Sequence, residues 1–283
     1  MSSALTRRAA GRRARTAGFH LVAGGLSALW LLPIALVLLT SVRTFDDIAA
    51  DGLGAVPRSA TLAGYGAAWT DGGEARAMLN SLIITVPTVL LSLALGAAAA
   101  FALSRYRIPF RRAIILLMLA GNLLPPQILL VPVFKLTELL GFYDTLAADI
   151  VVQLGFGLGF YTFVLQGFMR SIPDEIQQAA VIDGASPTQI FLRIILPLAR
   201  PALAALSALA FTWTFNDLLW AITVLRTESV MPVTPALLGL QGQFVSNWNV
   251  VAAGSVIAAI PTVAVFLRFQ RHFISGLALG AVK

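Results

Sequence analysis

Residues 178–197 read QAAVIDGASPTQIFLRIILP, and this stretch predicts a sharp bend between two short helices. The segment just before it, Ser171–Glu175, has the composition of a helix start, with its serine as the expected N-cap and acids in the first turn. Gly184 is suited to end that helix, because glycine readily takes the left-handed conformation at a helix C-terminus. Ser186 and Pro187 are suited to begin the next helix. We therefore expect a helix–glycine–helix elbow.

The second helix of the elbow has its own signals. Gln189 lies three residues after Ser186, which is the spacing of a capping box. Pro197 is expected to interrupt the helix. Its apolar face is expected at Ile190, Phe191, Ile194 and Ile195.

Two uses of the elbow are open at this point. The small pair Ala179 and Ala180 lets another surface approach closely, which favours a docking knob for a protein. An amphipathic hairpin lying on lipid headgroups would show a similar pattern.

The composition of the whole chain is that of a membrane protein. Of its 283 residues, 58% are hydrophobic and only 12% are charged, against about 25% charged residues in soluble domains. There are no cysteines and two histidines, which argues against disulfides, thiol catalysis and a histidine metal cluster. Six apolar stretches are long enough to cross a bilayer. They are Thr16–Val42, Ala77–Ser104, Ala113–Phe134, Ile150–Met169, Pro201–Leu225 and, within Ser229–Leu267, the strongly apolar Val250–Leu267.

The positive charges indicate the orientation of these spans. The net charge is +7, and 15 of the 20 Lys and Arg residues lie in the two termini and in the second and fourth connections. The positive-inside rule places those segments in the cytoplasm, so the chain is expected to be a multi-pass protein of a bacterial cell membrane with both termini cytoplasmic. Charges spread between spans do not form the basic surface that nucleic acid requires, so no nucleic-acid partner is expected.

The expected organisation is one membrane domain with short flanking segments. The first span is too long for a cleaved signal peptide and is interpreted as an uncleaved anchor. The long first outer loop is rich in glycine, and we expect irregular structure there with a short helix near Gly64–Trp69. The predicted segments are a basic cytoplasmic tail (1–15), the first transmembrane helix (16–42), an extracytoplasmic loop (43–76), a core of five transmembrane helices (77–268) that includes the cytoplasmic loop 170–200, and a cytoplasmic C-terminal tail (269–283).

The elbow resembles the "EAA" loop of bacterial ABC importer permeases. That family pattern is E-A-A, three residues, G, nine residues, I, one residue, L-P. Gln178 stands where the family usually has Glu, and the other positions match. The resemblance implies an all-α permease of the type I (MetI-like) fold with six transmembrane helices and a cytoplasmic coupling helix. It assigns ATPase docking to Gln178, Ala179, Ala180, Asp183, Gly184, Ala185, Ser186, Ile194, Leu196 and Pro197.

Further matches are similar to the carbohydrate-uptake branch of that family, and the chain resembles the smaller partner of a maltose-type permease pair. His272 stands where the branch usually has Tyr. The matching segments are Asn80–Ser81, Ala98–Tyr106, Pro125–Pro126, Ile182–Ser186, Phe215–Asp217, Phe269–Phe273, Gly276 and Gly280–Lys283.

The resemblance also implies a set of partners. An extracytoplasmic binding protein would deliver a sugar or polyol to a pair of different permeases embedded in membrane lipid, and two ATPase subunits would drive import. The sequence has no G-x-x-x-x-G-K-[ST] phosphate-binding motif, so ATP and Mg²⁺ are expected on the ATPase, and this chain is expected to be neither an enzyme nor a cofactor-binding protein.

Polar and aromatic residues within the spans are candidates for the substrate pathway. Asp217 is the one acid inside the predicted spans, with Asn216 beside it and Trp213 and Trp220 on either side. The interpretation that we favour over direct sugar contact is a hydrated carboxylate near the outer interface and an aromatic belt. Further candidates, which could instead form hydrogen bonds between helices, are Asn122, Gln127 and Gln153.

Two other classes of function were weighed. A secondary transporter working without an ATPase would normally show an internal repeat and several buried charges. A membrane-embedded enzyme would need paired acids, histidines or a Ser/Lys dyad at membrane depth. Neither pattern is visible in the sequence.

The topology can be tested directly, because the chain has no native cysteine. Cysteine is placed at Ser3 or at Gly54, and intact cells are treated with a membrane-impermeant thiol reagent. We expect labelling at position 54 and none at position 3 until the membrane is permeabilised. Labelling of position 3 in intact cells would contradict the predicted orientation.

Overall fold

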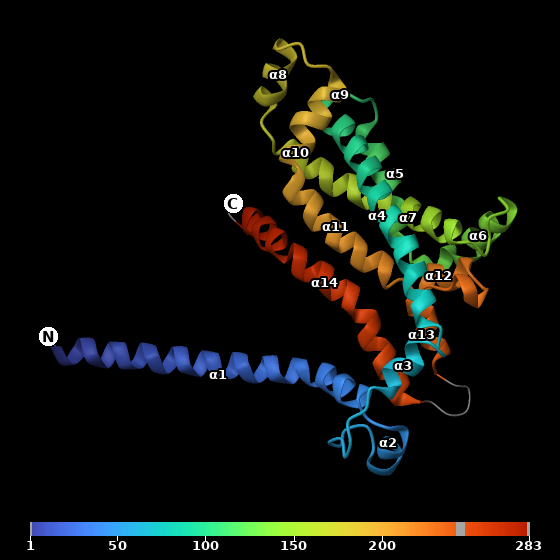
Figure 1. Ribbon diagram of the computed structural model, residues 1–283. Coiled ribbons are helices and arrows are strands. Elements are labelled where there is room, and N and C mark those ends of the chain that lie inside the picture. The colour runs from blue at the N-terminus through green and yellow to red at the C-terminus, as the bar shows by residue number, and fades with distance from the viewer. Residues whose placement is uncertain (1, 242–246, 282–283) are drawn as a thin grey trace. The chain divides into compact units, whose positions relative to one another are not determined.

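The computed structural model describes residues 2–241 and 247–281, and the side chains of residues 16, 18–241 and 247–270. The regular structure in these residues is helical (Figure 1), so the expected all-α class is confirmed. The chain divides into two compact units. One comprises residues 1–68 and 241–256, and the other comprises residues 69–240 and 257–283.

The first unit holds α1 (Ser2–Ser41), α2 (Phe45–Asp51), most of α3 (Ala63–Trp69) and the start of α14 (Trp248–Ala281). The short helix expected near Gly64–Trp69 is therefore confirmed as α3. α2 was not expected. The Thr44 side chain accepts the backbone N–H of Asp47 at 3.2 Å, which caps the first turn of α2. The basic tail expected at residues 1–15 is continuous with α1.

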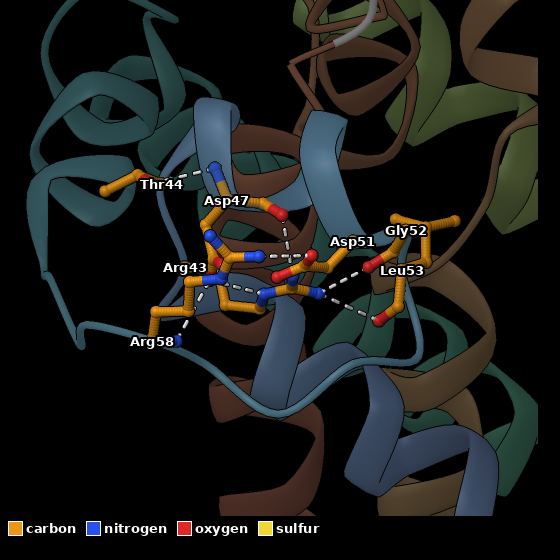
Figure 2. A network of polar contacts seen from close by, with 7 residues as sticks. All are labelled: Arg43, Thr44, Asp47, Asp51, Gly52, Leu53 and Arg58. Carbon is orange, nitrogen blue, oxygen red and sulfur yellow. Dashed lines mark hydrogen bonds and ion pairs between the residues drawn. The ribbon is translucent and has the colours of Figure 1, made fainter.

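The loop after α1 is organised around one buried arginine (Figure 2). The Arg43 side chain is fully buried, and its Nε donates to the Asp47 carboxylate at 2.8 Å. Its two terminal nitrogens donate to the carbonyls of Gly52 at 2.6 Å and of Asp47 at 2.9 Å. The hydrogen bond from Arg43 is the main reason that the pKa of the Asp47 carboxyl lies below its usual value. A loop that looked irregular in sequence is therefore held in a defined shape by charge-assisted hydrogen bonds.

The second unit contains the rest of the helices. Its centre is the packing of α4 (Glu74–Arg105) against α7 (Leu146–Arg170). The other elements are α5 (Arg111–Leu123), α6 (Pro126–Leu139), α8 (Asp174–Ile182), α9 (Pro187–Ile190), a π-helix (Phe191–Ile195), α10 (Leu196–Leu198), α11 (Arg200–Phe215), α12 (Leu219–Val224), a 3₁₀ turn (Glu228–Val230), α13 (Val233–Gly239) and the remainder of α14.

Small residues allow the helices around α7 to approach closely. A Cβ added at Gly96 of α4 would lie 3.3 Å from the Cβ of Tyr161 on α7. At Gly159 of α7 the backbone of α5 is closer still, because an added Cβ would lie 1.9 Å from the carbonyl oxygen of Met118. Small side chains at such contacts are typical of helices packed within a membrane.

Four of the six expected spans are confirmed as continuous apolar helices, by length and composition. They are Gly18–Ser41, Glu74–Arg105, Leu146–Arg170 and Trp248–Gln270. Pro87 and Pro261, expected to kink helices, lie inside α4 and α14 without ending them. α14 continues to Ala281, so much of the expected C-terminal tail is helical. The side chains of the expected C-terminal motif from Arg271 onward, His272 included, lie outside the described residues.

The third span was expected to be one helix, Ala113–Phe134, with a kink at two prolines. This was wrong in degree, because α5 and α6 meet there at 98°. Leu124 takes an extended conformation before Pro125, as the steric restriction on a residue that precedes proline favours. Pro126 then begins α6. Two successive residues without an N–H remove two helical hydrogen bonds, so the span breaks.

The fifth span also differs from the expected Pro201–Leu225. α11 ends at Phe215, and α12 begins only at Leu219. At its other end, α11 is joined at 74° to the helical segment Pro187–Leu198, which belongs to the elbow. Asp217 therefore lies in a break between two helices and not inside a continuous span.

The close contact at Gly159 gives a stability prediction. Gly159→Ala should push α5 away from α7 and lower the free energy of unfolding by about 3 kcal/mol, the upper end for overpacking. Gly155, also on α7, has no atom within 4 Å of an added Cβ. Gly155→Ala is the matched control and should raise stability by about 0.5–1 kcal/mol, because alanine favours helix. Thermal unfolding of the purified protein in detergent measures both, and shifts of the same sign would contradict this packing.

Candidate functional site

The first half of the elbow is α8, and its start differs from the expectation. Ser171 was expected to be the N-cap, but its backbone is still right-handed helical and it ends α7, its hydroxyl donating to the Phe168 carbonyl at 2.7 Å. An N-cap needs an extended backbone, so Ser171 does not serve as one. α8 begins at Asp174, directly after Pro173, and its first turn carries Asp174 and Glu175 as expected.

The turn of the elbow is confirmed in detail. Gly184 has φ +80°, in the left-handed region. The N–H of Ala185 donates to the carbonyl of Ala180 at 2.9 Å, and that of Gly184 to Val181 at 3.0 Å. This is the pair of hydrogen bonds of a Schellman motif, which glycine accommodates with little strain.

The second half of the elbow begins with the expected capping box. The Ser186 hydroxyl accepts the N–H of Gln189 at 3.3 Å, and the Gln189 side chain accepts the N–H of Ser186 at 2.8 Å. Pro187 is at the first helical position. The expected interruption at Pro197 was wrong, since the helical segment continues to Leu198. A π-helical turn, with the N–H of Leu196 bonded to the carbonyl of Phe191, immediately precedes the proline.

The elbow is anchored by one apolar face. Ile190 and Ile195 are buried against residues of α4 and α7, and Phe191 and Ile194 pack on the same cluster, as expected. Ala180 also belongs to this cluster and is 7% exposed. The expectation that Ala179 and Ala180 together face another protein was therefore wrong for Ala180, whose replacement by Trp would disrupt the chain's own core.

The opposite face of the elbow is open. Two exposed apolar residues that the motif did not single out lie on it, Val181 at 58% and Ile182 at 85% exposure. Helical spacing from Gln178 was the signal that could have identified them. Of the motif residues, Ala185, Ile194, Leu196 and Pro197 are half-buried, and those exposed in this chain are Gln178, Ala179, Asp183, Gly184 and Ser186.

The candidate pathway residues are joined through α7. Trp220 stacks on Phe156 with ring centroids 4.5 Å apart, and Trp213 lies against Phe160 at 5.2 Å. Trp213 is half-exposed, whereas Trp220 is buried. Phe156 and Phe160 are one helical turn apart, a spacing that could have placed both on the face that meets the tryptophans.

The polar candidate residues differ in the hydrogen bonds that they form. Asn122, near the end of α5, donates to the carbonyl of Phe156 at 2.9 Å, so its expected interhelical hydrogen bond is confirmed. Gln153 instead donates to Asp149 of its own helix at 2.8 Å. Gln127 is exposed in the first turn of α6.

The break in the fifth span is held by its own side chains. One carboxylate oxygen of Asp217 accepts the N–H groups of Trp220 and Ala221, at 3.1 and 3.0 Å, which stabilises the start of α12. Asn216 is exposed and donates to Thr212 on α11 and to Thr262 on α14.

Two buried acids were not identified as candidates from the sequence. Glu74, at the start of α4, and Asp149, in the first turn of α7, are each 1% exposed. Asp149 directly precedes the apolar run Ile150–Met169, and Glu74 lies three residues before the run Ala77–Ser104, so both fell outside the spans as they were bounded.

Comparison with known proteins identifies relatives along nearly the whole chain. It is 30% identical to the melibiose/raffinose/stachyose import permease protein MelC of Bacillus subtilis, over 96% of this chain and 99% of the relative. It is 32% identical to the trehalose transport system permease protein SugB of Mycobacterium tuberculosis, over 89% and 92% of the two chains.

The fold is similar to that of solved importers. A chain of a bacterial ABC transporter involved in import of the acidic polysaccharide alginate aligns with a TM-score of 0.81 at 24% identity, covering 92% of this chain and 97% of the other. Residues 92–278 match the family described as the binding-protein-dependent transport system inner membrane component. That match covers well over half of the sequence, and the chain belongs to this family of transport permeases.

Proposed function

We propose that this protein is one permease subunit of an ATP-driven importer for a sugar or a related polyol. The relatives that support this proposal are named as permeases for melibiose, raffinose, stachyose and trehalose. In our proposal an extracytoplasmic binding protein delivers the sugar, a second and different permease completes the channel, and two ATPase subunits bind ATP and Mg²⁺. This chain carries out no hydrolysis itself.

The observation that carries the proposal is the two-sided construction of the elbow. Ala180, Ile190 and Ile195 are buried against α4 and α7, so a force applied to the elbow is transmitted to the helices that cross the membrane. The face with Gln178, Ala179 and Ile182 remains exposed and serves as the ATPase-docking surface. With six spans and the elbow in the cytoplasm, both termini lie on the cytoplasmic side of the bacterial cell membrane.

The substrate pathway in this proposal follows the two broken spans. Non-helical backbone at membrane depth is tolerated where it is buried in protein or lines a hydrated cavity. Asn122, at the end of α5, and Trp220, at the start of α12, both contact Phe156. Aromatic faces beside amide groups suit sugar rings and hydroxyls, and Asn122, Trp213 and Asn216 are exposed.

Uptake in proteoliposomes tests the function and the pathway together. The complex with its second permease, ATPase and binding protein should import radiolabelled trehalose or raffinose only when ATP is enclosed with the ATPase. Trp213→Ala should lower uptake by about tenfold, which corresponds to the loss of about 1.4 kcal/mol of sugar binding free energy. The yield of the complex should not change, because Trp213 is 53% exposed. Trp213→Phe should retain most activity.

Trp30→Ala is the matched control, since Trp30 on α1 is 81% exposed. Equal effects at Trp30 and Trp213 would indicate an aromatic belt and not a sugar contact. Uptake that continues without the ATPase would contradict the importer itself.

The turn of the elbow gives a prediction about docking. Gly184→Val places a β-branched residue at φ +80°, at a cost of about 1–2 kcal/mol for the left-handed conformation. An added Cβ meets no atom within 4 Å, so the effect acts through the backbone of the elbow. We expect less ATPase to copurify with the permease, together with lower uptake.

Gly184→Asn is the control for this substitution. Asparagine has a side chain of similar size but tolerates the left-handed conformation, so docking should be largely kept. Gln178→Glu should also be mild. If the Val variant binds ATPase and imports sugar as the wild type does, the elbow is not the coupling element.

A further inference from the structure

One buried arginine connects the end of α4 to both sides of the α7–α8 junction. Arg105 is the last residue of α4, and its side chain is 2% exposed. One terminal nitrogen donates to the carbonyls of Met169 at 2.7 Å and Ile172 at 2.9 Å. The other terminal nitrogen forms an ion pair with the carboxylate of Asp174.

The groups at this junction are arranged with opposite charges next to each other: the carbonyl end of α7, the Arg105 guanidinium and the Asp174 carboxylate. The last carbonyls of α7 carry the negative end of its helix dipole, and a cation there is favourable. Asp174 opens α8, where the dipole is positive and an acid is favourable. The Arg105 guanidinium therefore lies between the negative end of one helix and the acid that begins the next.

The segment between α7 and α8 is short, Ser171–Pro173. Ile172 within it is buried in the same apolar cluster as Met169 and Ala180. Apolar packing holds the elbow on the helices but is not directional. The planar guanidinium fork has fixed donor directions, and it contacts both the end of α7, at the Met169 carbonyl, and the first turn of α8, at the Asp174 carboxylate.

A cleft of about 440 Å³ opens beside this contact, with Ser104 of α4 on one wall and Gln178 and Val181 of α8 on the other. Arg105 also lines this cleft. The ion pair between Arg105 at the end of α4 and Asp174 of α8 therefore lies at the edge of this cleft.

We propose that Arg105 is a positioning residue that makes the α7–α8 junction a rigid joint, so that movement of the elbow is passed to α4 and α7 as one body. This inference rests on the proposed coupling function of the elbow and assigns the transmission step to a residue outside the EAA motif. Without the guanidinium, the elbow still docks on the ATPase but turns partly on its own, and ATP is hydrolysed with less sugar moved.

The test measures sugar imported per ATP hydrolysed, using the complete importer in proteoliposomes with radiolabelled trehalose. Arg105→Gln should lower this ratio by about tenfold, within the usual range for coupling between sites. The amount of ATPase that copurifies should stay within about twofold of wild type. The rate of ATP hydrolysis measured without the binding protein should also stay within about twofold. A purely structural role would lower complex yield and leave the ratio unchanged.

Three further variants sharpen the result. Asp174→Asn should lower the ratio by an intermediate amount, because it weakens the contact of the guanidinium on α8 and leaves the hydrogen bond to the Ile172 carbonyl in place. Arg105→Lys should be intermediate, since an ammonium cannot match the fork of donors. Arg107→Gln removes an exposed arginine nearby and is the control.

A wild-type ratio in Arg105→Gln would overturn the inference. If that variant does not assemble, Arg105→Lys decides, and a wild-type ratio there would likewise overturn it. Failure of the wild-type complex to import sugar with ATP would instead remove the proposed function, so the two failures are distinguishable.

Discussion

The contact between α4 and α7 is the one on which the rest of the second unit depends. Within a bilayer the surrounding lipid is as apolar as the helix surfaces, so helices associate through close packing of small residues and through hydrogen bonds. Gly96 meets the backbone of α7, and Gly159 meets the backbone of α5. The buried cluster built on this contact continues from α4 and α7 to Ala180 and Ile190 in the elbow, so the same packing that forms the bundle also positions the exposed face of the elbow.

The features that the sequence predicted well are set by local interactions. Gly184, Ser186 and Gln189 form the turn and the capping box that their spacing indicated, because each hydrogen bond joins residues at most five positions apart. Four spans were identified for a similar reason, since their length and apolar composition are decided residue by residue.

The features that were missed depend on distant parts of the chain or on competing local signals. Ser171 has the residue type of an N-cap, but its backbone is right-handed helical and it is the C-cap of the preceding helix. Ala180 looked available to a partner, yet it packs into the chain's own cluster, and composition does not show which side of a helix faces the core. α2 forms where Arg43 binds carbonyls nine and ten residues away, and no periodicity in the loop signals such a contact.

The candidate pathway was only half visible for a related reason. Tryptophan and amide residues inside apolar runs are conspicuous, so Trp213, Trp220 and Asn122 were selected from the sequence. Phe156 is an ordinary residue of an apolar helix until the fold brings two broken spans to it, one through the Asn122 side chain and the other through the Trp220 ring.

The break between α11 and α12 also explains what Asp217 does in the structure. Each break exposes backbone groups that lipid cannot satisfy, and Asp217 accepts two N–H groups at the start of α12. Its carboxylate therefore has a structural role that a substrate contact would have to share. The Asn216 side chain is exposed, and its amide nitrogen already donates to Thr212 on α11 and to Thr262 on α14. Both polar residues at this break therefore form hydrogen bonds within the chain, which their residue types alone did not indicate in the sequence.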